Sequence, residues 1–160
     1  MVLEVGAKVP DVALVAITGE THKEVSTAEL LGRGKVVLFA VPGAFTPTCS
    51  DYHLPGFVIR SQELKAKGVD LIACIAVNDV FVMSAWGRSQ SIGDEVTLLA
   101  DGSGEFAKAA GLELDLNAVG LGTRSQRYAM ILQDGIVTSI EVEPGAELTV
   151  ASAEAVLAKL

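Results

Sequence analysis

The stretch KVVLFAVPGAFTPTCS, residues 35–50, is an apolar run followed by a turn rich in proline and threonine that ends in a cysteine and a serine. A short run of this kind is typical of a strand buried on both faces of a sheet. Pro47 suits the first turn of a helix, because its missing N–H is not needed there. The stretch therefore predicts a strand that passes through a turn into a helix, with Cys49 at the start of that helix.

Strand and helix patterns alternate along the rest of the chain. Four further apolar runs read as strands: 69–77, 96–100, 128–132 and 136–142. Four segments read as helices: 50–68, 80–89, 105–111 and 152–160. This alternation predicts parallel strands with right-handed crossovers. Asp134 and Gly135 form a hairpin turn signal between the last two strands, which should therefore be antiparallel.

The fold class that follows is α/β, with a central mixed β-sheet flanked by helices in the thioredoxin-like arrangement. A flavodoxin-like topology is the alternative, and the terminal hairpin counts against it. Ser26 and Glu29 have the spacing of a capping box and predict a short helix after residue 26. Pro55 should kink or interrupt the helix over 50–68, and Gly68 is placed to end it.

Composition limits the classes of protein that the chain can represent. The 160 residues fit a single domain, 1–160, and half of them are hydrophobic, which excludes a disordered chain. The formal net charge of −8 argues against a nucleic-acid partner. No apolar run is long enough to cross a membrane, and residues 1–14 lack the pattern of a secretory signal or a transit peptide. We expect a cytoplasmic protein, or the mature form of a plastid or mitochondrial one.

Cys49 is the first candidate for chemistry. Unpaired N–H groups and the helix dipole at the start of a helix stabilise a thiolate, and Thr46 and Thr48 place hydroxyls near the sulfur. The plainer alternative is a small cysteine packed under a loop, and the local residues alone do not decide between the two. Two cysteines and two histidines give no zinc-ligand spacing.

The turn also matches a family pattern, Pro-x-x-x-Thr-x-x-Cys, at Pro42, Thr46 and Cys49. It is followed in order by HLPGF (53–57), VND (77–79), FVMSAW (81–86), LADGSGEF (99–106), VGLGTRS (119–125) and QRYAMILQDG (126–135). Over nearly its whole length the chain resembles the type II peroxiredoxins of plants and bacteria.

The resemblance implies roles for particular residues. Cys49 corresponds to the peroxidatic nucleophile, which becomes a sulfenic acid. Thr46 would hydrogen-bond the sulfur and the peroxide, and Pro42 would shield the sulfenic acid and shape the loop. The essential arginine of the family matches Arg127, with Arg124 as the runner-up. From the residues alone, either arginine would be taken for a solvated charge.

The same resemblance implies a thiol-dependent peroxidase for hydrogen peroxide and organic hydroperoxides, serving antioxidant defence and redox homeostasis. No cofactor, metal, haem or flavin is expected, because the cysteine carries the electrons. The expected reductant is glutaredoxin with glutathione, or thioredoxin. Aromatic residues such as Phe81 and Trp86 are expected in the core or at an interface, and a homodimer follows from the resemblance.

Cys74 lies inside an apolar run and matches the proposed resolving cysteine of plant-like members, which would form a disulfide with Cys49. Its setting favours core packing instead, because a buried thiol reacts poorly and a central strand has little freedom to move. In animal-like members, the cysteine that attacks the sulfenic acid lies near the position of Val150. Either Cys74 reacts after local unfolding or an external thiol attacks the sulfenic acid, and we favour the external thiol.

Two further alternatives concern His53 and the function itself. His53 follows Cys49 by four residues, which invites a Cys–His pair, but the family uses no such base. We therefore expect an ordinary polar helix or loop residue there. The rival function is a redox sensor or holdase-type binding protein switched by oxidation of Cys49. A binding module with inactive chemistry is the third option, and it should lack one of Pro42, Thr46, Cys49 and Arg127.

Overall fold

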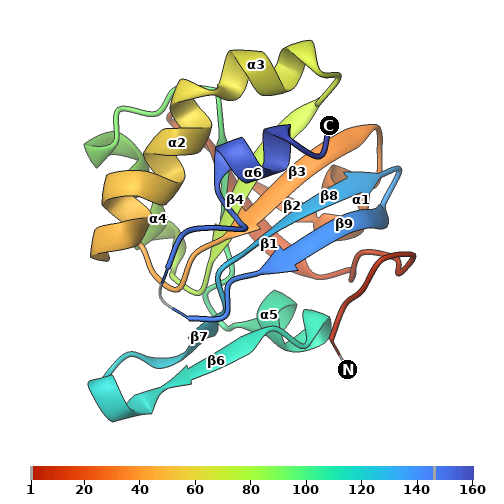
Figure 1. Cartoon of the computed structure of the whole chain (residues 1–160). Coiled ribbons are helices and arrows are strands. Elements are labelled where there is room, and N and C mark those ends of the chain that lie inside the picture. The colour runs from red at the N-terminus through yellow and green to blue at the C-terminus, as the bar shows by residue number, and fades with distance from the viewer. Residues whose placement is uncertain (1, 146) are drawn as a thin grey trace.

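A mixed sheet of seven strands forms the centre of the protein, in the order β2-β1-β5-β4-β3-β8-β9 (Figure 1). The computed structural model describes residues 2–145 and 147–160. The strands of this sheet are β1 Ala13–Thr18, β2 Thr21–Ser26, β3 Lys35–Ala40, β4 Leu71–Ala76, β5 Thr97–Ala100, β8 Tyr128–Gln133 and β9 Ile136–Val142. The five strands expected from apolar runs are therefore all present.

The middle of the sheet is parallel and its flanks are antiparallel. β3 pairs with β4, and β4 with β5, in parallel, whereas β8 runs antiparallel to both β3 and β9. The turn between β8 and β9 places Asp134 at φ 50° and Gly135 at φ 82°. Two successive positive φ angles are the geometry that an Asp-Gly hairpin favours. The prediction of a mixed sheet with a terminal hairpin is confirmed.

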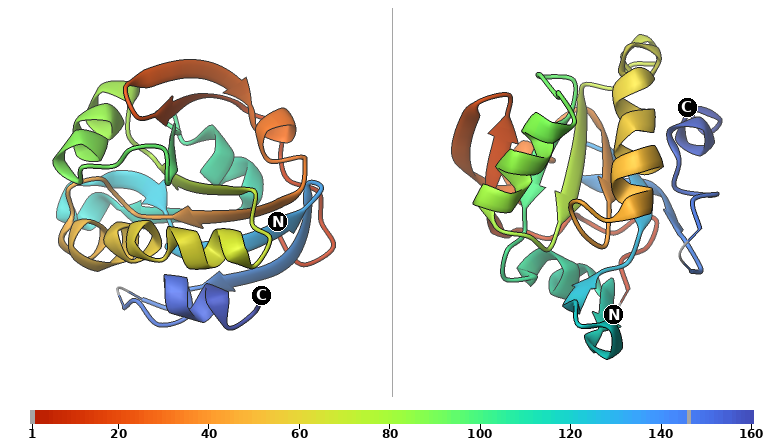
Figure 2. Two further views of the ribbon diagram at one scale, coloured as in Figure 1. Left: turned by 90° about the horizontal axis from the view of Figure 1, so that it is seen from above. Right: turned by 90° about the vertical axis from the view of Figure 1, so that its left-hand side faces the viewer.

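Helices cover both faces of the sheet. They are α1 Thr27–Leu30, the π-helix η1 Cys49–His53, α2 Leu54–Ile59, α3 Ser61–Ala66, α4 Val80–Ser89, α5 Glu105–Ala110, the 3-10 helix η2 Asn117–Val119 and α6 Ala153–Leu157. Phe39 of β3 joins the core layer of α2, α3, α4 and α6, and its neighbour Leu38 joins the layer of α5. Alternate residues of a strand point to opposite faces, so one strand supplies both layers. Figure 2 shows α6 beside α2 and α3.

The helix expected over 50–68 is present as three pieces. A π-helix runs to His53, α2 begins at Leu54, and a break at Arg60 separates α2 from α3. Pro55 lies in the first turn of α2, where its missing N–H is tolerated. The irregularity therefore precedes the proline, in the turn that carries Cys49. Gly68 follows the end of α3 at φ 93°, as expected of a residue that ends a helix.

Two hairpins were not expected from the sequence. β1 and β2 form one at the edge of the main sheet, and β6 Glu113–Leu116 and β7 Gly122–Ser125 form a separate two-stranded sheet. The second hairpin projects away from the main sheet below α5 in Figure 1. The predicted cap at Ser26 is confirmed, since its hydroxyl oxygen accepts the N–H of Glu29. None of the helices described is both long and apolar enough to span a bilayer.

Candidate active site

The candidate site lies at the sheet edge where β3 ends and β8 begins. These strands are antiparallel, and Ala40 at the end of β3 pairs with Tyr128 at the start of β8. The loop that follows β3 and the residue that precedes β8 therefore meet at one edge. This register brings Arg127 to Cys49, although 78 residues separate them in the sequence.

Cys49 is the first residue of the π-helix, and its exposed fraction is 0%. Its Sγ accepts a hydrogen bond of 3.1 Å from Arg127 Nη2. The guanidinium keeps its positive charge, and a charge-assisted bond is strong in a site that water does not reach. The arrangement therefore stabilises negative charge on the sulfur. The sequence placed Cys49 correctly at a strand-to-helix junction.

His53 holds the same guanidinium from the other side. Arg127 Nη1 donates to His53 Nδ1 at 2.7 Å, and His53 Nε2 bonds the carbonyl oxygen of Ala151 at 2.8 Å. Since arginine can only donate, Nδ1 is the acceptor and Nε2 carries the proton. Burial, and then the charge of Arg127, lower the pKa of His53 to about 3, although the bond to Ala151 opposes this shift. His53 is thus a buried neutral support for Arg127, a role that the expectation of an ordinary polar residue missed.

The loop before Cys49 is fixed by its own hydrogen bonds. Thr46 Oγ1 donates to the carbonyl oxygen of Gly43 at 2.7 Å. The amide of Ala44 donates to Asn78 Oδ1 at 2.9 Å, which ties the loop to the start of α4. Phe45 has φ 65°, a left-handed conformation that costs a non-glycine residue energy. The Thr46 hydroxyl proton is therefore committed to the backbone, not to the sulfur as the resemblance implied.

A cavity of about 400 Å³ opens beside this loop. Pro42, Thr46 and Arg127 line it on one side, and leucines of the β6–β7 hairpin line it on the other. Arg127 is buried, and its Nε has no hydrogen-bond partner among the described residues. A buried donor without a partner is one that a bound molecule can satisfy. Three of the four predicted catalytic residues thus face a common space.

Arg124 stands apart from the sulfur. Its Nε donates to the carbonyl oxygen of Leu121 at 2.8 Å, and its Nη1 makes a longer bond of 3.4 Å to the carbonyl oxygen of Pro42. Arg127, the preferred of the two arginines, is the one that reaches Cys49. Arg124 contacts the backbone of the cysteine loop instead.

Cys74 is a free thiol in the interior of β4, paired in register with Phe39 and Leu98. It is buried in the same core layer as Cys49. Burial raises the pKa of the Cys74 thiol well above its usual value, and the nearby Cys49 adds to the effect. The protonated thiol is a poor nucleophile, so the folded state does not prepare Cys74 for attack.

The two aromatic residues singled out from the sequence have opposite environments. Trp86 is fully buried, and its indole Nε1 donates to Ser50 Oγ at 2.9 Å. Phe81 is 79% exposed at the start of α4. Phe45 is also exposed, and the bond between Ala44 and Asn78 holds its loop against the same end of α4.

Glu143 lines the same cavity and holds the segment that binds His53, a role that was not anticipated. Its buried carboxylate accepts the amide N–H groups of Thr149, Val150 and Ala151, each at 2.8 Å, and the Thr149 hydroxyl at 2.9 Å. Ala151 is the residue whose carbonyl oxygen binds His53. Glu143 therefore fixes the segment that holds His53. A single glutamate after a strand gives no sequence signal of this role.

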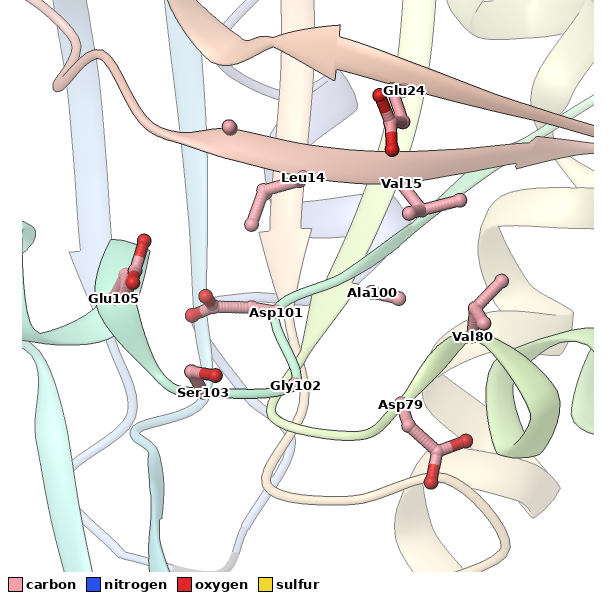
Figure 3. Close-up of a pocket in the computed structure, with 11 residues that line it drawn as sticks. Leu14, Val15, Glu24, Asp79, Val80, Ala100, Asp101, Gly102, Ser103 and Glu105 are labelled. Carbon is pink, nitrogen blue, oxygen red and sulfur yellow. The ribbon is translucent and has the colours of Figure 1, made fainter.

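A second cavity, of about 410 Å³, lies away from the cysteine loop between β1, β5 and the start of α4 (Figure 3). Its most buried acidic group, Asp101, accepts the N–H groups of Phe106 and Ala107 and so caps α5. Burial raises the pKa of Asp101. Within the described part of the chain, no group of three or more potential ligands is arranged to hold a metal ion. This cavity contains none of the predicted site residues.

Comparison with known proteins agrees with this geometry. The family model described as Redoxin matches residues 4–157. Peroxiredoxin-2E, chloroplastic, of Arabidopsis thaliana is 51% identical over 162 residues, which cover 99% of this chain and 69% of that protein. Peroxiredoxin-2B of the same organism is 48% identical over 159 residues, which cover 99% of this chain and 98% of that protein.

A solved structure shares both sequence and fold with the chain. The crystal structure of reduced Prx3 from Vibrio vulnificus in complex with hydrogen peroxide superposes with a TM-score of 0.91 at 50% identity. The match covers 98% of this chain and 95% of that one. The similarity therefore extends over the whole sheet and the helices that carry the site.

Proposed function

The chain belongs to the redoxin family and is a type II peroxiredoxin, a thiol-dependent peroxidase, and from this premise we propose that Cys49 is its peroxidatic nucleophile. The observation that carries the proposal is the 3.1 Å bond from Arg127 Nη2 to Cys49 Sγ inside a buried site. This bond supplies a fixed positive charge where a thiolate must form and react.

The oxidising step balances as a displacement at oxygen. The Cys49 thiolate attacks the terminal oxygen of a hydroperoxide, an S–O bond forms and the O–O bond breaks. The sulfur is oxidised to the sulfenic acid, and the leaving oxygen, reduced to an alkoxide or hydroxide, takes up a proton and departs as an alcohol or water. Negative charge moves from sulfur to oxygen during the step, so donors fixed near both atoms stabilise the transition state.

Arg127 is suited to donate hydrogen bonds to the Cys49 sulfur and to the leaving oxygen at the same time. Nη2 contacts the sulfur, Nη1 donates to His53, and Nε is buried with no partner among residues 2–145 and 147–160. Thr46 complements it, because a hydroxyl whose proton is bonded to Gly43 can still accept the hydrogen of the peroxide. Pro42 lines the cavity and has no N–H that would need water.

The catalytic cycle closes with a thiol reductant. We propose that an external thiol, glutathione with glutaredoxin, attacks the sulfenic acid, releases water and forms a mixed disulfide. A second thiol then displaces the Cys49 thiolate and leaves as a disulfide. The burial of Cys74 and its raised pKa favour this route over a disulfide between Cys49 and Cys74. Thioredoxin acting through Cys74 is the alternative, and it requires β4 to open.

The rest of the assignment is also proposed. The chain forms one domain over 1–160, it acts in the cytoplasm, and two copies associate through the exposed side chains of Phe45 and Phe81. Two large apolar side chains exposed on neighbouring segments are typical of an interface.

Peroxide consumption with defined reductants tests the function. Wild type and Cys74→Ser should both consume hydrogen peroxide repeatedly with glutathione and glutaredoxin. Consumption of a single equivalent, followed by inactivity with every reductant, would show a sensor instead. If wild type turns over and Cys74→Ser does not, and only thioredoxin serves as reductant, then Cys74 is the resolving cysteine that attacks the sulfenic acid.

A further inference from the structure

The β6–β7 hairpin has little support of its own. It forms a separate two-stranded sheet, and most of its residues are at least partly exposed. Isolated two-stranded sheets are only marginally stable in water. Among the hydrogen bonds that residues 113–125 make within the described chain, only that from Arg124 to Pro42 reaches a segment distant in sequence. The position of the hairpin over the cysteine loop therefore depends on few groups.

Arg124 connects the two sides of the catalytic cavity. Its guanidinium donates to the carbonyl oxygens of Leu121 in the hairpin and Pro42 in the cysteine loop, and both residues line the cavity. The Pro42 bond is long, at 3.4 Å, but the guanidinium also lies close to Gly43. A Cβ added to Gly43 would be 2.9 Å from Arg124 Nη1, so a larger residue there would displace the guanidinium.

The strand register places apolar side chains beside Arg124. Leu114 of β6 pairs directly with Arg124 of β7, so their side chains share one face of the hairpin. Leu116 lies two residues further along β6 and points to the same face. Leu114, Leu116 and Leu121 line the cavity together with Thr46 and Arg127. These three leucines, which we call the leucine wall, give the cavity an apolar surface near the Arg127 that contacts Cys49.

We propose that Arg124 is a positioning residue that holds the leucine wall against the cysteine loop, and that it thereby sets the preference for organic hydroperoxides with an apolar substituent. The inference rests on the proposed peroxidase function of Cys49. Hydrogen peroxide has no substituent to contact the wall, so Arg124 affects it less. A hydroperoxide with an aromatic or alkyl group gains binding energy only where the wall is in place.

The test compares cumene hydroperoxide with hydrogen peroxide in wild type, Arg124→Ala and Arg124→Lys. We expect Arg124→Ala to lower kcat/KM for cumene hydroperoxide roughly tenfold relative to that for hydrogen peroxide, mainly by raising KM. Arg124→Lys should give an intermediate ratio, because one ammonium group cannot reproduce the two-pronged contact. Arg33→Ala is the matched control. It removes an exposed arginine just before β3, at the opposite end of that strand from Pro42.

Amide hydrogen exchange of residues 113–125 provides a second measurement that does not depend on activity. Faster exchange there in Arg124→Ala, together with the changed ratio, supports the proposal. Faster exchange with an unchanged ratio shows a purely structural role and overturns it, as does a tenfold loss shared equally by both peroxides. Unchanged exchange in Arg124→Ala would show that Arg124 does not hold the hairpin in place, and would also overturn the proposal. If wild type consumes neither peroxide, the peroxidase function itself fails, and this inference fails with it.

Discussion

Arg127 Nη1 donates to His53 Nδ1 over 2.7 Å, which fixes the histidine as an acceptor and leaves Nη2 directed at Cys49 Sγ. The nearest imidazole to the nucleophile is therefore committed to the arginine and does not act as its base. The Ala151 carbonyl oxygen accepts from His53, and the Ala151 amide N–H donates to Glu143, which completes the support. The positive charge beside the sulfur is thus held in place by a chain of buried hydrogen bonds.

Stability should fall on acidification because of His53. Its pKa is about 3 in the folded protein and about 6.5 in an unfolded chain. Between these values the unfolded state binds more protons, so the contribution of neutral His53 is complete above pH 6.5 and is lost as the pH falls. Denaturant unfolding at several pH values measures how the free energy of unfolding changes with pH. This change should be less steep in His53→Gln than in wild type, by up to about 1.4 kcal/mol per pH unit.

Arg127→Gln should slow peroxide reduction by roughly 10²- to 10³-fold, because it removes a fixed cationic donor from the sulfur and from the developing oxyanion. Single-turnover oxidation of Cys49 by hydrogen peroxide measures this step directly. Arg33→Ala, which removes an exposed arginine, should react like wild type. A loss of less than threefold in Arg127→Gln would remove the arginine from the mechanism.

Cys74→Ala should retain most of the turnover with glutathione and glutaredoxin, because Cys74 is part of the core. The variant removes one buried sulfur and should lower the free energy of unfolding by about 1–2 kcal/mol. Steady-state assays with each reductant, together with denaturant unfolding, separate the two effects. Near-complete loss with every reductant in a protein that remains folded would identify Cys74 as an obligatory resolving residue.

Glu143→Ala should destabilise the protein strongly. It leaves three amide N–H groups of residues 149–151 without their acceptor, and the buried one, that of Ala151, costs about 1–3 kcal/mol when it is left unpaired. Glu141→Ala is the matched control, because the Glu141 side chain forms a surface ion pair with Lys159, worth about 0–1 kcal/mol. Equal unfolding free energies for the two variants would contradict the role given to Glu143.

Phe81→Asp should convert the proposed dimer to a monomer, because it places a charge on a side chain that the interface would bury. Ile59→Asp on α2 is the control, since Ile59 is equally exposed, at 79%, outside the proposed interface. Sedimentation velocity should give a monomer for Phe81→Asp and a dimer for Ile59→Asp. A dimeric Phe81→Asp would show that the two copies do not associate through Phe81.

Strands β3, β4, β5 and β8 could be predicted because they are buried almost throughout and read as apolar runs. β2 could not, because it lies at the sheet edge with exposed side chains, THKEVS, and gives no apolar pattern. The hairpin of β6 and β7 was missed because its four-residue strands, ELDL and GTRS, are mostly at least partly exposed and form no apolar run. Local signals for turns and caps, at Asp134-Gly135 and Ser26, were sufficient because their partners are close in sequence.

Only part of the site could be predicted from the sequence, for a related reason. The position of Cys49 followed from local sequence, and the preference for Arg127 over Arg124 came from the family resemblance. The support by His53, Ala151 and Glu143 depends on contacts across about 100 residues, as between His53 and Ala151. A histidine at a helical position and a glutamate after a strand look ordinary until the fold brings them together.

Stopped-flow fluorescence of Trp86 tests the central claim most directly, because its indole N–H donates to Ser50, the residue next to Cys49. With hydrogen peroxide in excess, wild type and Cys74→Ser should show the same rapid signal, with a rate proportional to peroxide. The signal should be absent in Cys49→Ser and slowed by roughly two orders of magnitude in Arg127→Gln. A signal that persists in Cys49→Ser, or an unchanged rate in Arg127→Gln, would contradict an Arg127-held Cys49 nucleophile.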